Sequence, residues 1–312
     1  MPVIGVIETK DLSRSFGSVT VVDHLNMSIP SGEVFGFLGP NGAGKTTTVR
    51  MLACLIKPSG GTATVDGLDV TDEKDAMQVR SRVGLLTETP GLYDTLSAYK
   101  NLRFYGRLYD VPEQRLNDRI EYYLKLLGLW EKRDQAVGGY SKGMRQKIAI
   151  ARCLLHDPKV LFLDEPTSGL DPEASHLVRD FISELKKEGR TIFLCTHNLD
   201  EADRLCDRIG IFRGHLLSVD SPSRLKDKLY GRQVVVKLKE VTPTLVNTVK
   251  AQNYVGGVEV NGKELLVRVN SPESDNPALV RALVAAGADI QFVSEASRSL
   301  EDVYFNIMGV KQ

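Results

Sequence analysis

The sequence has no long apolar segment and few cysteines, and each shortage excludes a class of protein. No uninterrupted run of apolar residues exceeds six, at residues 51–56, whereas a membrane-spanning helix needs about 20. The four cysteines stand far apart, without the spacing of a zinc site or a disulfide framework. We therefore expect core thiols, and a chain that does not itself cross a membrane.

Neither sign of charge is in excess. Forty Lys and Arg residues balance 40 Asp and Glu residues, and 42% of the chain is hydrophobic. This balance is typical of globular proteins and gives no basic surface for a nucleic acid partner. The length of 312 residues allows about two domains. The first residues lack the basic and apolar segments of a secretory signal, which predicts a cytoplasmic protein.

Hydrophobic periodicity predicts an α/β fold for residues 1–222. A strand pair at residues 7–30 would form an antiparallel β edge, and mostly helical sequence at about 93–155 would form an inserted helical subdomain. Strands and helices alternate through the rest, which implies a largely parallel sheet wrapped by helices. The expected strands are residues 34–38, 83–86, 160–163 and 191–195, and the expected helices around them begin at residues 48, 144, 172 and 200.

A break at Ser221-Pro222-Ser223 marks a second domain, residues 223–312. Its pattern reads strand, helix, strand, strand, helix, strand between residues 234 and 293, with the second helix at 277–286. This order suggests a small α+β domain of the ferredoxin-like type. Residues 300–308 have apolar side chains at helical spacing and predict an amphipathic closing helix.

A glycine loop between an apolar strand and a helix carries the clearest chemical signal. Residues 39–46 match the pattern G-x-x-x-x-G-K-[ST], in which backbone N–H groups surround phosphate oxygens. Lys45 would reach the β- and γ-phosphates, the Thr46 hydroxyl would bind Mg²⁺, and Thr47 would donate to a neighbouring phosphate. The expected ATP-binding residues of this segment are Gly39, Asn41, Gly42, Gly44, Lys45, Thr46 and Thr47.

Two carboxylates follow the strand at residues 160–163, where ligands of α/β sheets bind. Asp164 would hold Mg²⁺ directly or through water. Glu165 would orient and deprotonate the water that attacks the γ-phosphorus. Together with the glycine loop, this pair predicts a nucleotide-hydrolysing site.

The segment Tyr140-Ser141-Lys142-Gly143-Met144-Arg145-Gln146, followed by Asp164-Glu165 and then His197, resembles the ordered motifs of the ATP-binding cassette (ABC) ATPases. The resemblance implies a P-loop NTPase fold and a head-to-tail dimer, in which Ser141 and Gly143 meet the ATP of the opposite protomer. It makes His197 the switch histidine of the catalytic site. Residues 166–171 are similar to the family's D-loop, which places Asp171 at the dimer interface.

Two further positions follow from the same resemblance. Phe16 precedes the glycine of the first turn, where the family stacks an aromatic ring on adenine; a core phenylalanine is the alternative. After the strand at 83–86 the family has a glutamine, whereas this chain has Thr87-Glu88-Thr89-Pro90. We align Glu88 with the glutamine and assign it as a third ligand of Mg²⁺ or of its waters.

The resemblance covers about residues 7–222, and residues 223–312 are similar to the accessory domain of drug and antibiotic exporter ATPases. It predicts an ATP-hydrolysing exporter subunit, peripheral on the inner face of the cell membrane, with a separate integral-membrane permease docked at residues 91–109. One alternative is a cytosolic ABC ATPase without a transport role. Another is an ATP-gated regulatory subunit with slow turnover.

Overall fold

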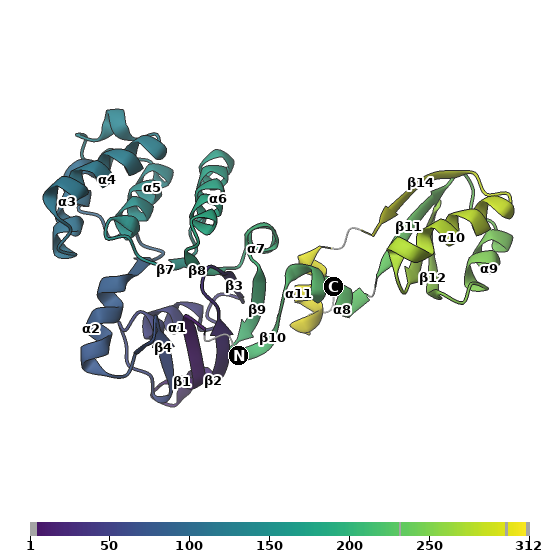
Figure 1. The fold of residues 1–312 in the computed structure, drawn as a ribbon, viewed down its shortest axis with the longest axis horizontal. Coiled ribbons are helices and arrows are strands. Elements are labelled where there is room, and N and C mark those ends of the chain that lie inside the picture. The colour runs from purple at the N-terminus through teal and green to yellow at the C-terminus, as the bar shows by residue number, and fades with distance from the viewer. Residues whose placement is uncertain (1–4, 231, 297–298, 310–312) are drawn as a thin grey trace. The chain divides into compact units, whose positions relative to one another are not determined.

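The computed structural model describes residues 5–230, 232–296 and 299–309. It divides after Ser221 into two compact units. Figure 1 shows the first unit in purple to green and the second in green to yellow. Within the described residues, no helix is both long enough and apolar enough to span a membrane.

The first unit contains two sheets (Figure 1). The smaller sheet is antiparallel, in the order β2-β1-β4-β5. The larger has the order β10-β9-β3-β8-β7-β6, parallel except where β10 pairs with β9. Their strands are β1 Ile7–Phe16, β2 Val19–Ile29, β3 Val34–Leu38, β4 Gly60–Val65, β5 Leu68–Asp69, β6 Val83–Leu86, β7 Val160–Asp164, β8 Thr191–Thr196, β9 Arg208–Arg213 and β10 His215–Asp220.

Seven α-helices are described in this unit, and three of them, α3 to α5, pack together as a helical subdomain (Figure 1). Their bounds are α1 Lys45–Leu52, α2 Glu73–Arg82, α3 Ala98–Leu108, α4 Glu113–Leu126, α5 Lys142–Leu154, α6 Pro172–Lys187 and α7 Leu199–Leu205. Each of α3 and α5 begins at a serine whose hydroxyl accepts a backbone N–H of the first turn, an N-cap arrangement.

The central strands of the larger sheet are buried on both faces. Every residue of β3, β7 and β8 is buried, as expected for parallel strands covered by helices. Phenylalanine rings fill the space between the layers, with Phe37 centred 4.5 Å from Phe212 and 5.1 Å from Phe193. This packing fixes the strand ends from which the polar loops emerge.

The second unit contains an antiparallel sheet in the order β12-β13-β11-β14, the arrangement of a split βαβ chain. Its core consists of aliphatic side chains from the sheet and from α9 and α10. The elements are α8 Pro222–Tyr230, β11 Gln233–Leu238, α9 Pro243–Lys250, β12 Val255–Asn261, β13 Glu264–Val269, α10 Pro272–Ala285, β14 Ile290–Glu295 and α11 Leu300–Ile307.

The predicted α/β class, antiparallel edge and inserted helices are confirmed. The sequence pattern missed α2, because Val79 is its one buried residue and no apolar stripe marks it. It also missed β4, β5 and the hairpin of β9 and β10. The chain divides into its two units at the expected break, and α8 begins there at Pro222. The helix expected from residue 277 begins at Pro272, because that proline takes the first helical position.

Candidate functional site

The larger sheet brings three polar segments to one edge. Parallel pairing places Leu38 beside Thr196 and Asp164 beside Cys195, so β3, β7 and β8 end at the same level. The glycine loop follows the first of these strands, Glu165 the second and His197 the third. This is the carboxyl edge of the sheet, where open α/β sheets bind ligands.

The glycine loop needs glycine at two positions for different reasons. Gly44 stands before α1 with φ +103°, a conformation that other residues rarely adopt. A Cβ atom on Gly39 would lie 2.2 Å from the Phe212 carbonyl oxygen. The loop is therefore held against β9, and no side chain caps the first turn of α1. Its free N–H groups can bind an anion.

Lys45 is held inside this loop. Its side chain is nearly fully buried, and its ammonium group donates to the Gly39 carbonyl oxygen at 2.6 Å and to the Pro40 carbonyl oxygen at 3.2 Å. The same nitrogen lies 3.8 Å from Oε1 of Glu165. A fixed cation in a loop of N–H groups can bind several phosphate oxygens together.

Asp164 ends β7 and is 2% exposed. Its Oδ2 accepts a hydrogen bond of 2.7 Å from the Thr46 hydroxyl, whereas its buried Oδ1 has no hydrogen-bond partner. Burial raises the pKa of the Asp164 carboxyl, and the charges of Glu165 and Glu88 raise it further against the opposing effects of Thr46 and Lys45. A cation bound here would relieve both the unpaired oxygen and the repulsion.

Glu165 has φ +53°, which is uncommon outside glycine and marks a constrained backbone. Its amide donates to the Cys195 carbonyl oxygen at 2.9 Å, which ties it to the end of β8. Oε2 lies 2.8 Å from Nδ1 of His197, and the buried Oε1 makes no hydrogen bond. A carboxylate with one oxygen held and one free is suited to accept a proton from water.

These groups line one cavity of about 500 Å³. It brings together ten of the site residues expected from the sequence and three that were not assigned to the site. The lining residues are Val21, Asn41, Gly42, Ala43, Gly44, Lys45, Thr46, Thr47, Glu88, Asp164, Glu165, Ser168 and His197.

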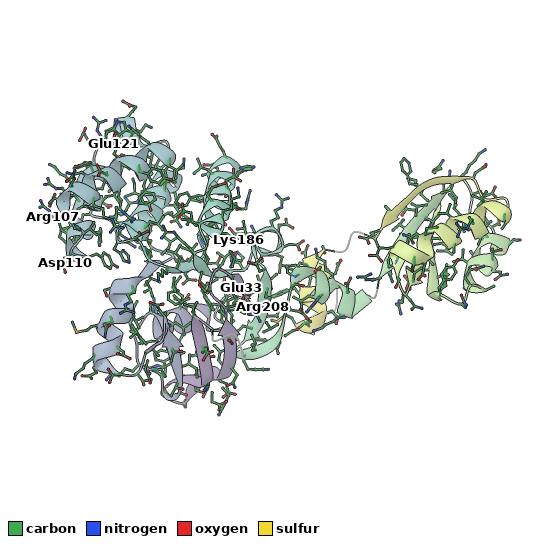
Figure 2. All side chains as sticks on the ribbon, in the orientation of Figure 1. Glu33, Arg107, Asp110, Glu121, Lys186 and Arg208 are labelled. Carbon is green, nitrogen blue, oxygen red and sulfur yellow. The ribbon has the colours of Figure 1, made fainter. Side chains whose placement is uncertain are left out.

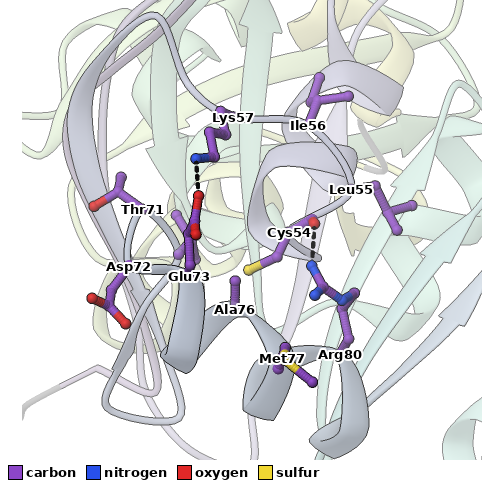
Figure 3. A pocket seen from close by; sticks show the side chains of 11 residues that line it. Cys54, Leu55, Ile56, Lys57, Thr71, Asp72, Glu73, Ala76, Met77 and Arg80 are labelled. Atoms are coloured by element: carbon purple, nitrogen blue, oxygen red, sulfur yellow. Dashed lines mark hydrogen bonds and ion pairs between the residues drawn. The ribbon is translucent and has the colours of Figure 1, made fainter.

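A second cavity, of about 410 Å³, lies between the end of α1 and the start of α2 (Figure 3). Lys57 pairs with Glu73 at 2.8 Å, and Arg80 donates to the Cys54 carbonyl oxygen at 2.9 Å. It shares no lining residue with the first cavity. Lys57, Glu73 and Arg80 of this cavity thus already have partners.

Comparison with known proteins gives the family. Residues 22–168 match the family model described as ABC transporter. The ABC transporter ATP-binding protein NatA of Bacillus subtilis (strain 168) is 43% identical over 72% of this chain and 96% of its own length. The bacitracin transport ATP-binding protein BcrA of Bacillus licheniformis is 35% identical over 97% of both chains. The chain belongs to the ABC transporter ATP-binding proteins.

A solved structure agrees with this assignment. The chain resembles cbiO1 of Clostridium perfringens, part of the ABC transporter complex cbiONQ, with a TM-score of 0.66 and 29% identity over 72% of this chain and 92% of that one. The protein is thus an ABC ATPase that binds and hydrolyses ATP as a subunit of a transporter.

Five expected residues of this ABC ATPase lie outside the lining of the cavity. Ser141 caps the start of α5, where its hydroxyl accepts the Met144 N–H at 3.2 Å, and Gly143 packs against Ala174. Asp171 caps α6 by accepting the Ala174 N–H at 2.7 Å. Phe16 ends β1 and is 47% exposed, and Gly39 holds the loop from behind. One chain therefore brings together only part of the expected site.

The sequence analysis missed Val21, Ala43 and Ser168 in the lining, and a buried carboxylate, Glu201, behind it. Ser168 could have been found from its place three residues after Glu165. Val21 could not, because it comes from β2 of the other sheet and only the tertiary packing brings it to the cavity.

Proposed function

We propose that this ABC ATPase hydrolyses ATP to drive export of a substrate through a separate integral-membrane permease. The observation that carries the proposal is the single cavity in which the glycine loop, Asp164, Glu165 and His197 meet. The names of relatives that match 97% of this chain, among them the bacitracin transport protein and the Nod factor export ATP-binding protein I of Rhizobium sp. (strain N33), support transport and export.

In this proposal the glycine loop binds the ATP phosphates. Backbone N–H groups from Asn41 to Thr47 would surround the β-phosphate, and Lys45 would leave its carbonyl partners to bind the β- and γ-phosphates. Phe16 would stack on adenine. Its exposure and the Arg14 guanidinium carbon 4.5 Å from its ring centre support this role over that of a core residue.

Mg²⁺ fits the oxygen-donor set at the carboxyl edge. Thr46 and Asp164 would hold it, since their side chains already meet and Oδ1 of Asp164 is unpaired. Glu88 lines the same cavity and would be an outer ligand. When bound, the ion would neutralise charge on the phosphates.

Glu165 and His197 would act on the attacking water. The free Oε1 of Glu165 would accept the proton of the water, and His197 would hold the other oxygen so that the carboxylate keeps its direction. Lys45, 3.8 Å away, keeps this carboxylate close to the phosphate-binding loop. The chain itself therefore supplies the base, its orienting group and the anion site.

The second half of each site would come from a second copy of the chain. Ser141 and Gly143 stand at the start of α5, outside the cavity, where a hydroxyl and N–H groups can bind an anion. A head-to-tail dimer would bring them to the ATP of the partner, with Asp171 at the interface. This arrangement accounts for a site that one chain leaves incomplete.

Residues 91–109 would receive the permease. Tyr93, Phe104 and Leu108 are exposed there, and Lys100, Arg103, Phe104, Arg107 and Leu108 line a hollow of about 430 Å³. Such apolar surface is typical of a protein interface. We further propose that residues 1–222 form the ATPase domain and 223–312 an accessory domain, on the cytoplasmic face of the membrane.

The test uses the tagged full chain expressed in its own source. Membranes solubilised gently should yield a stoichiometric multi-spanning protein together with the chain, identified by mass spectrometry. Recovery with ribosomes or assembly factors instead would support a cytosolic, non-transport ATPase and contradict the proposal.

A second test addresses catalysis. Glu165→Gln should lower ATP turnover by about 10²- to 10⁴-fold, the usual range for loss of a general base, and should trap an ATP-bound dimer in size-exclusion chromatography. A wild-type chain that binds ATP with the same affinity yet turns over no faster than Glu165→Gln would favour the ATP-gated regulatory subunit.

A further inference from the structure

We propose that Glu201 is a positioning residue for hydrolysis, which joins the turn carrying His197 to the turn that follows Glu165. The inference rests on the proposed roles of Glu165 and His197. Glu201 lies in the first turn of α7, is 1% exposed and does not line the cavity. A carboxyl group so deeply buried lowers folding stability unless hydrogen bonds or opposite charges compensate, because burial disfavours its charged form.

Three hydrogen bonds close the turn that carries His197, between Thr196 and Glu201. The Thr196 hydroxyl donates to Oε2 of Glu201 at 2.9 Å, and the Thr196 hydroxyl oxygen accepts the N–H of Asn198 at 3.0 Å. Oδ1 of Asn198 in turn accepts the N–H of Glu201 at 3.1 Å. The backbone of His197 lies between Thr196 and Asn198, so this ring sets the direction in which its exposed imidazole leaves the strand.

The Thr196 hydroxyl has one proton, and this geometry commits it to Glu201. The position therefore needs an acceptor at the reach of a glutamate side chain. Without it, Thr196 is free to rotate, and the N–H of Asn198 loses an oriented partner. His197 is held at its other end by Glu165 at 2.8 Å, so a loose turn would shift the same carboxylate that meets the attacking water.

The turn that follows Glu165, residues 165–168, also reaches the Glu201 carboxyl. The Thr167 hydroxyl lies beside this carboxyl and favours its charged form, and Thr167 is nearly fully buried. The N–H of Ser168 donates to the Glu165 carbonyl oxygen at 3.2 Å, and Gln146 of α5 donates to the Pro166 carbonyl oxygen at 2.9 Å. Glu201 thus contacts the segment that connects Glu165 to α5.

Oε1 of Glu201 is buried and makes no hydrogen bond. Burial raises the pKa of the Glu201 carboxyl above its ordinary value. The charge of Glu165 adds to this rise, whereas the Thr196 and Thr167 hydroxyls and Arg179 oppose it. The role that we assign depends on hydrogen bonding to Thr196, which a neutral acceptor can also provide.

The experiment measures kcat and KM for ATP in the full-length chain. Glu201→Ala should lower kcat roughly 10- to 100-fold with KM for ATP within about threefold of the wild type, because ATP contacts remain and the base is misplaced. Glu201→Gln should stay within about threefold of the wild-type kcat, since its amide oxygen accepts the same hydrogen bond. Glu201→Asp, which is one methylene shorter, should lose rate like the alanine variant, and it replaces that variant if Glu201→Ala does not fold.

A matched control removes a different buried carboxylate of the same unit. Glu33 is 7% exposed and pairs with Arg208 at the opposite end of the sheet. Glu33→Ala should lower the melting temperature without lowering kcat below the melting transition. If Glu33→Ala and Glu201→Ala reduce kcat equally at matched stability, Glu201 has only a structural role.

A double-mutant cycle with His197→Ala decides whether Glu201 acts through the histidine. If it does, adding Glu201→Ala to His197→Ala should change the residual kcat by no more than about twofold. Independent losses that multiply, or a Glu201→Ala variant with wild-type kcat, would overturn the inference. Unchanged rates in Glu165→Gln and His197→Ala would instead contradict the proposed function itself, so the two failures are distinguishable.

Discussion

Carboxylates at the two ends of the six-stranded sheet differ in how fully they are paired. At the amino end, both oxygens of each of three carboxylates have partners. Glu33 pairs with Arg208 through two hydrogen bonds, and Figure 2 shows these two side chains next to each other. Asp207 accepts from Lys186 and from the Val34 N–H. At the carboxyl end, Asp164 and Glu165 each leave one oxygen without a hydrogen bond.

Asp157 is the most connected of the amino-end carboxylates. Arg115, Arg119 and Arg190 all lie within 3.0 Å of its oxygens. Although burial alone would raise the pKa of Asp157, hydrogen bonds from Arg119 and Arg190 hold it below its ordinary value. These contacts join α4 of the helical subdomain to the start of β8.

The difference shows which carboxylates serve stability and which serve ligand binding. A carboxylate whose oxygens are all paired contributes to the fold and has no capacity for a ligand. One that is buried and half paired costs stability, and a bound cation, phosphate-linked water or proton recovers that cost. Both kinds flank β7, since Asp157 precedes the strand and Asp164 is its last residue.

The largest expected effect follows from removing the charge at the carboxyl end. Asp164→Asn should lower ATP hydrolysis at least about a hundredfold, because the metal loses an anionic ligand. The same change should raise the free energy of unfolding without nucleotide, since it removes a buried charge with a raised pKa. Parallel ATPase and urea-denaturation assays check both effects, and a fall in stability would contradict the comparison.

His156 lies at the amino end of the sheet, but only one of its two ring nitrogens has a hydrogen-bond partner, so it tests the comparison. Its Nε2 lies 3.0 Å from the Val83 carbonyl oxygen, whereas the buried Nδ1 has no partner. Burial lowers its pKa from 6.5 to about 4. The unfolded chain therefore binds a proton between these values that the folded chain does not, so stability falls as pH drops below 6.5.

We expect this histidine to cost about 2 kcal/mol of unfolding free energy between about pH 7 and pH 5. Urea denaturation at the two pH values measures the loss. His156→Gln, which keeps a donor for the Val83 carbonyl, should have a shallower pH dependence. An equal slope in both proteins would show that the histidine is not the source.

Asp157→Asn is the counterpart of Asp164→Asn at the amino end. It should lower the unfolding free energy by about 1 to 2 kcal/mol, a modest loss because the carboxyl is 40% exposed and screened by solvent. Asparagine tolerates the backbone at φ +63°, so the change removes charge without adding strain. ATP hydrolysis should stay at the wild-type rate; a loss of rate at unchanged stability would erase the distinction between the two ends.

The smallest effect on folding stability concerns Phe16, which belongs to neither end of the sheet. Phe16→Ala should weaken ATP binding by about 1 to 3 kcal/mol if the ring stacks on adenine. Its exposure predicts little change in folding stability. Equilibrium binding of a fluorescent ATP analogue and thermal melting separate the two effects, and melting at a lower temperature with unchanged affinity would indicate a packing role.

Much of the site could be predicted from local sequence, because each part is continuous in the chain. Residues 39–47 contain both the glycines and the groups they position, and Asp164 and Glu165 directly follow their strand. The same holds for the strands of the sheet, whose apolar runs are uninterrupted. In contrast, α2 and β10 lack a strong apolar pattern, since contacts from other elements stabilise them.

The sequence by itself determined the phosphate-binding loop and the carboxylates beside it, because their chemistry depends on neighbours one to eight residues away. Only the tertiary structure decided which charged side chains are paired within the fold. Glu33 and Arg208 are 175 residues apart in the chain, and Thr46 meets Asp164 across 118 residues. Such pairings arise from strand order and burial, so no local pattern shows that Asp157 is fully paired while Asp164 and Glu201 keep an oxygen free.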